Sequence, residues 1–199
     1  MENGKKVIMV TDGDKIARQA VEEATRQIGG RCISASAGNP TQLSGEQIVE
    51  LIQSTPYDPV VVMFDDRGST KKGRGEKALE YVVNHPAIEV IGVVAVASNT
   101  ANIEGVTVNC TVTRDKEVTT SQVDKEGKVI SPYSFVTGDT VDVLNKLGPK
   151  VPFIVGVGDI GKMEGRDNPA TGAQITTKAL QLILDHWRNT RKQDGKGEW

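Results

Sequence analysis

The chain has 199 residues, of which 37% are hydrophobic and 25% are charged, so it is long and apolar enough to fold around a core. Its formal net charge of −2 argues against a nucleic-acid partner, because such binding needs a positive surface that displaces counterions. No stretch approaches the roughly 20 apolar residues that span a bilayer, and the first residues do not form a signal peptide. We therefore expect a protein of cytoplasmic origin that reaches a membrane through partners or surface contact.

The first half of the chain alternates between short apolar runs and amphipathic stretches. The runs at the first and third expected strands are continuously apolar, which is typical of strands buried on both faces. This alternation predicts parallel pairing through right-handed crossovers. We expect strands at 5–11, 31–35, 60–64 and 89–97, and helices at 15–28, 45–53 and 76–84.

From residue 106 the pattern becomes an alternation of valine or cysteine with polar residues. It predicts an antiparallel hairpin or meander over 106–131, which would form a sheet-edge addition, a flap or a dimer arm. A short helix over 140–147, a buried strand over 153–157 and a long helix over 174–191 are expected next.

These elements predict a three-layer α/β/α fold with a mostly parallel sheet and the antiparallel hairpin insertion. Residues 1–191 would form a single domain, and residues 192–199 would form a mobile, charged tail. Cys32 and Cys110 fall in expected strands, and we expect two free thiols rather than a disulfide. The sequence leaves self-association into a homo-oligomer open.

Acidic residues gather where the expected parallel strands end. Open parallel sheets bind ligands beyond these carboxyl ends, which all lie along one edge. Carboxylates that meet there would repel one another unless they were protonated or bridged by a cation, for which Mg²⁺ or Ca²⁺ is suited. The alternative for Asp14 and Asp66 is that each only caps the helix that follows it. The candidate ligand or metal edge consists of Asp12, Asp14, Asp65, Asp66 and Asp159.

A glycine-rich loop after the third strand carries four cations, Arg67, Lys71, Lys72 and Arg74. Such a loop can fold over an anion, although a solvated surface loop is the more common outcome of this composition. Its glycines have Walker A spacing, but the lysine and the hydroxyl residue of that motif are absent, so we expect no P-loop. A GxGxxG run from Gly156 follows a strand, yet no helix opens there.

Two enzyme classes match in part. A phosphatase of the haloacid-dehalogenase type would use Asp12 as nucleophile and Asp14 as acid–base group, with Ser98 in its second motif. Asp159 and Asp167 would supply its acidic last motif, but no lysine clearly takes the third role. A Toprim-like site would hold a metal on the first and third strands, but its usual glutamate is absent. A Mg²⁺-dependent phosphoryl hydrolase is therefore the alternative function.

Several segments resemble one family when they are taken together. They are VIMVTDGD, VVVMFDDRG, the VD–EG–V hairpin at 123–129, and PFIVGVGDIGKMEGRD through TTKAL. Over nearly the whole chain the sequence is similar to the soluble subunit of stage V sporulation protein AE. The family has no established active residues that can be carried over.

The resemblance implies an accessory role in bacterial sporulation and spore germination rather than an enzymatic one. The family belongs to an operon for a membrane channel that handles dipicolinic acid. We accordingly expect the other channel subunits as partners and a peripheral position at the spore inner membrane. Dipicolinate is a dianion stored with Ca²⁺, so an acidic edge beside a cationic loop would suit such a chelate.

Overall fold

A mostly parallel seven-stranded sheet forms the centre of the molecule. The computed structural model describes residues 4–67, 73–98, 105–138, 140–193 and 195. The strand order is β2-β3-β1-β4-β11-β6-β7, and all neighbouring pairs are parallel except β6 with β7. The bounds are Lys5–Val10 for β1, Arg31–Cys32 for β2, Val60–Met63 for β3, Ile88–Val96 for β4, Cys110–Val112 for β6, Val118–Thr119 for β7 and Ile154–Val157 for β11.

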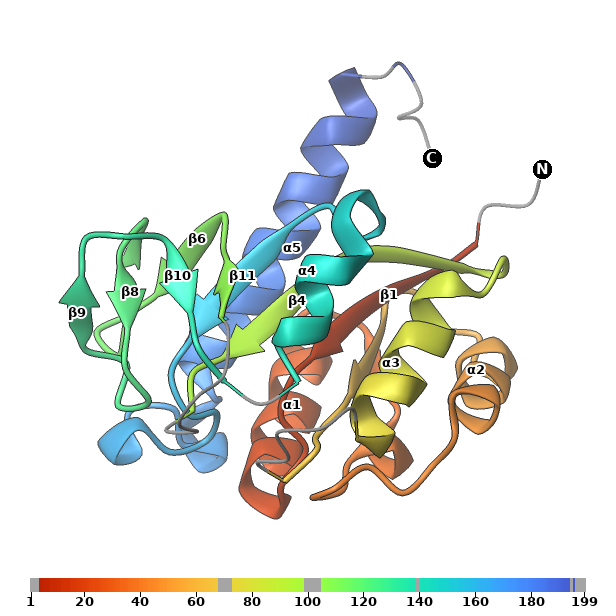
Figure 1. Cartoon of the computed structure of the whole chain (residues 1–199), viewed down its shortest axis with the longest axis horizontal. Coiled ribbons are helices and arrows are strands. Elements are labelled where there is room, and N and C mark those ends of the chain that lie inside the picture. Colours follow the sequence, from red (N-terminus) through yellow and green to blue (C-terminus); the bar gives the residue numbers. More distant parts are fainter. Residues whose placement is uncertain (1–3, 68–72, 99–104, 139, 194, 196–199) are drawn as a thin grey trace.

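Helices cover both faces of this sheet, which confirms the predicted three-layer α/β/α class (Figure 1). Side chains of α2, α3 and α4 pack into one apolar cluster, and side chains of α1 and α5 pack into a second cluster on the opposite face. The helices are α1 at Lys15–Gln27, α2 at Gly45–Ser54, α3 at Arg74–Asn84, α4 at Asp142–Leu147 and α5 at Gln174–Gln193.

The central strand β1 contributes to both clusters. Val7 and Met9 belong to the cluster under α2 and α3, whereas Ile8 and Val10 belong to the cluster under α1 and α5. All four side chains are fully buried, and each such burial is worth about 1.5–3 kcal/mol. This two-sided burial is the physical reason for the continuously apolar run in the sequence.

The region after β4 combines two of the arrangements that its alternating pattern allowed. β6 and β7 extend one edge of the main sheet, while β8 (Gln122–Val123) and β9 (Val129–Ser131) form a separate antiparallel hairpin. A further antiparallel pair joins β5 (Val106–Thr107) to β10 (Phe135–Val136). The insertion is therefore an addition to the sheet edge together with small, separate antiparallel pairs.

Some boundaries differ from the expected ones. β2 ends at Cys32 because the chain turns into a short 3₁₀ helix, in which the Ser36 hydroxyl donates to the Ile33 carbonyl and accepts from the Met63 amide. α5 continues to Gln193, two residues into the expected tail. The rest of that tail, apart from residue 195, lies outside the described residues, so its mobility stays a prediction.

The cysteines and the helix lengths bear on two further sequence expectations. Cys32 and Cys110 are both free thiols, as predicted. Among the described residues, no helix is both long enough and apolar enough to cross a bilayer.

Candidate functional site

A pocket of about 240 Å³ opens at the carboxyl ends of β1, β3, β4 and β11. This is the topological switch point of the sheet, because β1 has β3 on one side and β4 on the other. Open α/β sheets bind their ligands at such points. The charged residues of the lining are Asp12, Asp14, Asp65, Asp159, Lys125 and Lys162.

Close backbone packing holds the loop after β1 in place at the pocket. The Thr11 hydroxyl accepts a hydrogen bond from the Val96 amide at 3.0 Å, which ties the end of β1 to β4. A Cβ atom at Gly13 would lie 2.9 Å from the Gly38 carbonyl oxygen, so this loop and the loop after β2 touch along their backbones. The carboxylates on either side of Gly13 are therefore presented by a rigid turn.

Asp12 is the most deeply placed acid of the pocket. Its side chain is 9% exposed, and Oδ1 accepts a hydrogen bond from the Asp14 amide at 3.2 Å. Burial, together with the negative charges of Asp14, Asp65 and Asp159, raises the pKa of Asp12 to about 7. Asp12 therefore changes its charge state near neutral pH.

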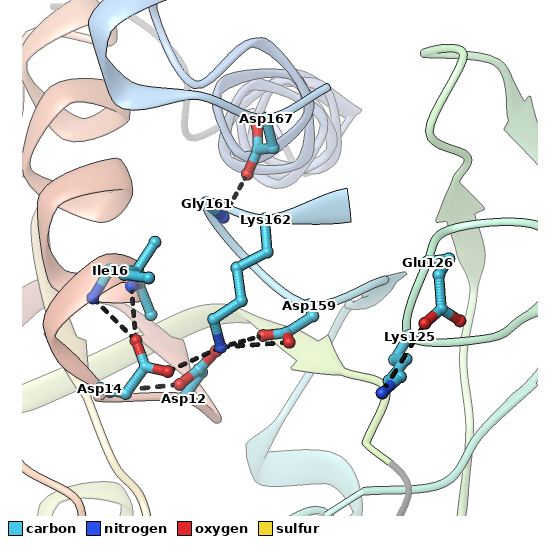
Figure 2. Close-up of polar contacts among 10 residues, drawn as sticks. Asp12, Asp14, Ile16, Lys125, Glu126, Asp159, Gly161, Lys162 and Asp167 are labelled. Atoms are coloured by element: carbon cyan, nitrogen blue, oxygen red, sulfur yellow. Dashed lines mark hydrogen bonds and ion pairs between the residues drawn. The ribbon is translucent and has the colours of Figure 1, made fainter. Parts of the chain in front are cut away.

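Lys162 forms hydrogen bonds with an acid from the loop after β1 and with an acid from the loop after β11 (Figure 2). Its Nζ donates to Asp14 Oδ2 at 2.7 Å and to Asp159 Oδ1 and Oδ2 at 2.9 and 3.1 Å. Burial alone would lower the pKa of Lys162, but the bonds to both carboxylates raise it above its ordinary value. The lysine is therefore a permanent cation inside the pocket.

Asp14 has a structural role in addition to this ion pair. Its Oδ1 accepts hydrogen bonds from the amides of Ile16 and Ala17, both at 2.8 Å, and so caps α1. Burial alone would raise the pKa of Asp14, but the bonds from Lys162 and from the helix amides outweigh it and hold the pKa below its ordinary value. Helix capping and pocket lining are thus combined in one carboxylate.

The two acids after β3 face in different directions. Asp65 lines the pocket, and its Oδ1 accepts from the Arg67 amide at 2.7 Å. Asp66 instead accepts from the amides of Gly75 and Glu76 at 2.7 and 2.9 Å, at the beginning of α3. Four of the five predicted acids therefore share one pocket, and Asp66 has the capping role that was its alternative.

The described cations of the predicted cationic loop do not line the pocket that holds the acids. Arg74 is the first residue of α3, and its Nη2 donates to the Gln42 carbonyl at 3.3 Å. Neither Arg67 nor Arg74 lines the pocket, and Lys71 and Lys72 lie outside the described residues. The cations that do line the pocket, Lys125 and Lys162, were not among the predicted site residues.

Asp167, which the phosphatase interpretation used, is a structural residue. It is fully buried and accepts hydrogen bonds from the amides of Gly161, Ile175 and Thr176 and from the Thr176 hydroxyl, at 2.6–3.0 Å. These bonds fix the beginning of α5 and the loop after β11. Asp167 is therefore committed to backbone amides and is unsuited to the acidic motif expected for a phosphatase.

The donors that the structure describes do not form a metal site by themselves. Within the described ranges, no group of three or more acid, histidine or cysteine side chains has a suitable geometry for an ion. Between Asp14 and Asp159, where a bridging Mg²⁺ or Ca²⁺ was expected, the Lys162 ammonium makes the bridge. These two carboxylates are thus neutralised by an internal cation.

Three comparisons with known proteins give different results, and one of them identifies a family. The chain is similar to the solution NMR structure of a de novo designed PLOOP2X3_50 fold protein, with 13% identity and a TM-score of 0.40 over 92% of this chain and 96% of that chain. No curated protein matches the chain. The family model described as stage V sporulation protein AE1 matches residues 6–187, which confirms the resemblance. The chain therefore belongs to the stage V sporulation protein AE1 family and is a sporulation-related protein.

Proposed function

We propose that the protein is an accessory factor of sporulation and spore germination that associates with the dipicolinic acid channel and acts by binding a small ligand in its switch-point pocket. Family membership supports the sporulation role. The observation that carries the binding role is the pocket at the switch point, with a buried carboxyl group in it. Association at the spore inner membrane would then be peripheral, through the other subunits of the operon.

Binding is favoured over the alternative of phosphoryl hydrolysis. One observation favours a hydrolase, because Lys162 supplies a lysine beside Asp14 that the phosphatase interpretation lacked. Two observations weigh against it: Asp167 is occupied by backbone amides, and burial beside other acids raises the pKa of Asp12 to about 7, so its carboxyl group holds a proton more readily than an ordinary aspartate does. A protonated carboxyl group is a poor nucleophile.

The channel association is tested by deleting the operon's other genes one at a time in the spore-forming host. We expect the protein to fractionate with the spore inner membrane in the parent strain and to leave that fraction when its partner is missing. A membrane fraction that retains the protein in every deletion strain would contradict the association.

The binding role is tested in the same spores with the variant Asp12→Asn. Dipicolinic acid release should slow at least several-fold, while the variant should stay in the membrane fraction. Asp185→Asn is the matched control, because it removes the same charge from an exposed position on α5. A phosphatase activity of the purified protein that Asp12→Asn abolishes would support the hydrolase instead.

A further inference from the structure

We propose that the switch-point pocket binds the ammonium group of a small organic cation, with Asp12 as the main hydrogen-bond acceptor. The inference rests on the proposed function, because it names the ligand class of the same pocket. It follows from the distribution of charge in the pocket, from the open acceptor on Asp12, and from the way the pocket already holds one ammonium group.

Among the described residues, the acids that line the pocket outnumber its cations. Four aspartates line it against two lysines. Lys162 is held by Asp14 and Asp159, and Lys125 lies 3.7 Å from Glu126 Oε1. Within the described part of the chain, no cation pairs with Asp12. A cationic ligand would therefore reduce the like-charge repulsion that Asp14, Asp65 and Asp159 exert on Asp12.

Asp12 also keeps an open acceptor. The hydrogen bond from the Asp14 amide engages Oδ1, and no other described residue donates to the Asp12 carboxyl group. The side chain is nevertheless only 9% exposed, and it lines the pocket. Thr111 Oγ1, and not Asp12 Oδ2, is the buried side-chain atom that lacks a partner among the described residues, so Oδ2 is accessible from the pocket, where a ligand N–H group can donate to it.

The same pocket shows which kind of cation it accommodates. The Lys162 ammonium makes three N–H···O contacts of 2.7–3.1 Å with two carboxylates, which is the geometry of charge-assisted hydrogen bonds. Metal ions require several oxygen ligands at shorter distances, and no described group of three acids offers them. A volume of about 240 Å³ suits a small molecule, because drug-sized ligands occupy pockets of about 300–1,000 Å³.

Binding of such a ligand should be coupled to the charge of Asp12. The charged groups that line the pocket with Asp12 are Asp14 from the loop after β1, Asp65 from the loop after β3, Asp159 and Lys162 from the loop after β11, and Lys125 from the turn between β8 and β9. An ammonium group prefers the ionised carboxylate, so binding competes with the proton on Asp12. Affinity should therefore rise about five- to tenfold from pH 6 to pH 8, a range in which the ligand amine stays charged.

The experiment follows the Asp14 amide in ¹H–¹⁵N NMR spectra, because that amide donates directly to Asp12. Ethylammonium chloride is titrated into the purified full-length protein at constant ionic strength. Tetramethylammonium chloride serves as a cation without N–H groups. Magnesium chloride, calcium chloride and calcium dipicolinate are titrated in parallel. We expect a saturable millimolar shift with ethylammonium and a response at least tenfold weaker with tetramethylammonium.

Two variants locate the effect. Asp12→Asn should weaken the ethylammonium response at least tenfold, whereas the control Asp185→Asn should leave it unchanged. If Asp12→Asn does not fold, the rise in affinity of the wild-type protein between pH 6 and pH 8 tests the same claim.

The proposal is overturned by a linear response to ethylammonium up to 100 mM, by equal responses to both ammonium ions, or by a divalent ion or calcium dipicolinate that acts at lower concentration. Such a result leaves the proposed function standing, because that function is judged by fractionation and dipicolinic acid release in spores.

Discussion

The chain segments that connect β1 to α1 and β3 to α3 have the same arrangement of acids. Each contains two aspartates, and in each the first lines the pocket while the second caps the next helix. Asp12 and Asp65 line the pocket without capping a helix, whereas Asp66, and Asp14 in addition to lining the pocket, accept hydrogen bonds from amides at the beginnings of α3 and α1. One aspartate of each pair is thus stabilised by a helix terminus, and the other faces the ligand site.

The two connections differ in the distance between the acid and its helix. α1 begins at the residue after Asp14, whereas α3 begins eight positions after Asp66, at Arg74. Asp14 therefore lines the pocket and contacts Lys162, while Asp66 lies at the beginning of α3 and does not line the pocket. The comparison teaches that the length of the connection decides whether a capping acid also serves the site.

The connection after β11 extends the comparison and gives the largest expected effect. Asp159 lines the pocket there, and Asp167 caps α5. Asp167→Ala should lower the free energy of unfolding by about 3–4 kcal/mol, because it leaves several buried donors without an acceptor. Urea unfolding measures the change. A loss below about 1 kcal/mol would contradict the division between capping and lining acids.

Asp167 stabilises the folded protein, whereas the ionised side chain of Asp12 should destabilise it. Its folded-state pKa is about 7 against an ordinary value of 3.8, so the folded state holds the proton more tightly. The stability from this proton is complete below pH 4 and is lost as the pH rises through 7. One pKa unit corresponds to about 1.4 kcal/mol, and since Asp12 lines an open pocket we expect a loss of about 2 kcal/mol rather than the full value.

Asp12→Asn should remove this loss. Between pH 4 and pH 8 the unfolding free energy of the wild type should fall by about 2 kcal/mol more than that of the variant. Urea unfolding at the two pH values measures this difference, and groups that titrate in both proteins cancel. Asp185→Asn should keep the wild-type dependence. Parallel pH profiles of Asp12→Asn and the wild type would show that Asp12 is not the destabilising acid.

The framework of the fold could be predicted from the sequence because it depends on local patterns. Continuous apolar runs located the buried strands β1 and β3, since such runs require layers on both faces. The spacing of Ser44 and Gln47 located the beginning of α2, where the capping box forms as predicted. The parallel pairing of β6 with β11 joins residues more than 40 positions apart, and no local pattern encodes it.

The candidate site was predictable in part for a similar reason. Parallel strands bring their carboxyl ends together, so the convergence of Asp12, Asp65 and Asp159 followed from the order of elements. The place of Lys162 depends on the turn after β11, where Gly161 has a φ of +76°. A lysine three residues after an acid in a glycine-rich turn was the available signal, but its direction depends on backbone geometry that composition does not fix.

The internal cation Lys162 gives the smallest expected effect. Lys162→Met should lower the unfolding free energy by about 1 kcal/mol or less at pH 7, because a side chain that is 36% exposed is screened by solvent. The loss should shrink at pH 3.5. The folded-state pKa of Asp14 lies below its ordinary value, so the stability from this pair is present above pH 4 and is lost as the pH falls.

Lys125→Met is the matched control, because Lys125 lines the same pocket but lies 3.7 Å from Glu126 at a more exposed position. Urea unfolding at pH 7 and at pH 3.5 compares the two variants, and the control should change less at pH 7. Equal losses for Lys162→Met at both pH values would mean that the lysine acts through packing of its stem rather than through its charge. The Lys162 ammonium would then be a weaker guide to the ligand that the pocket accepts.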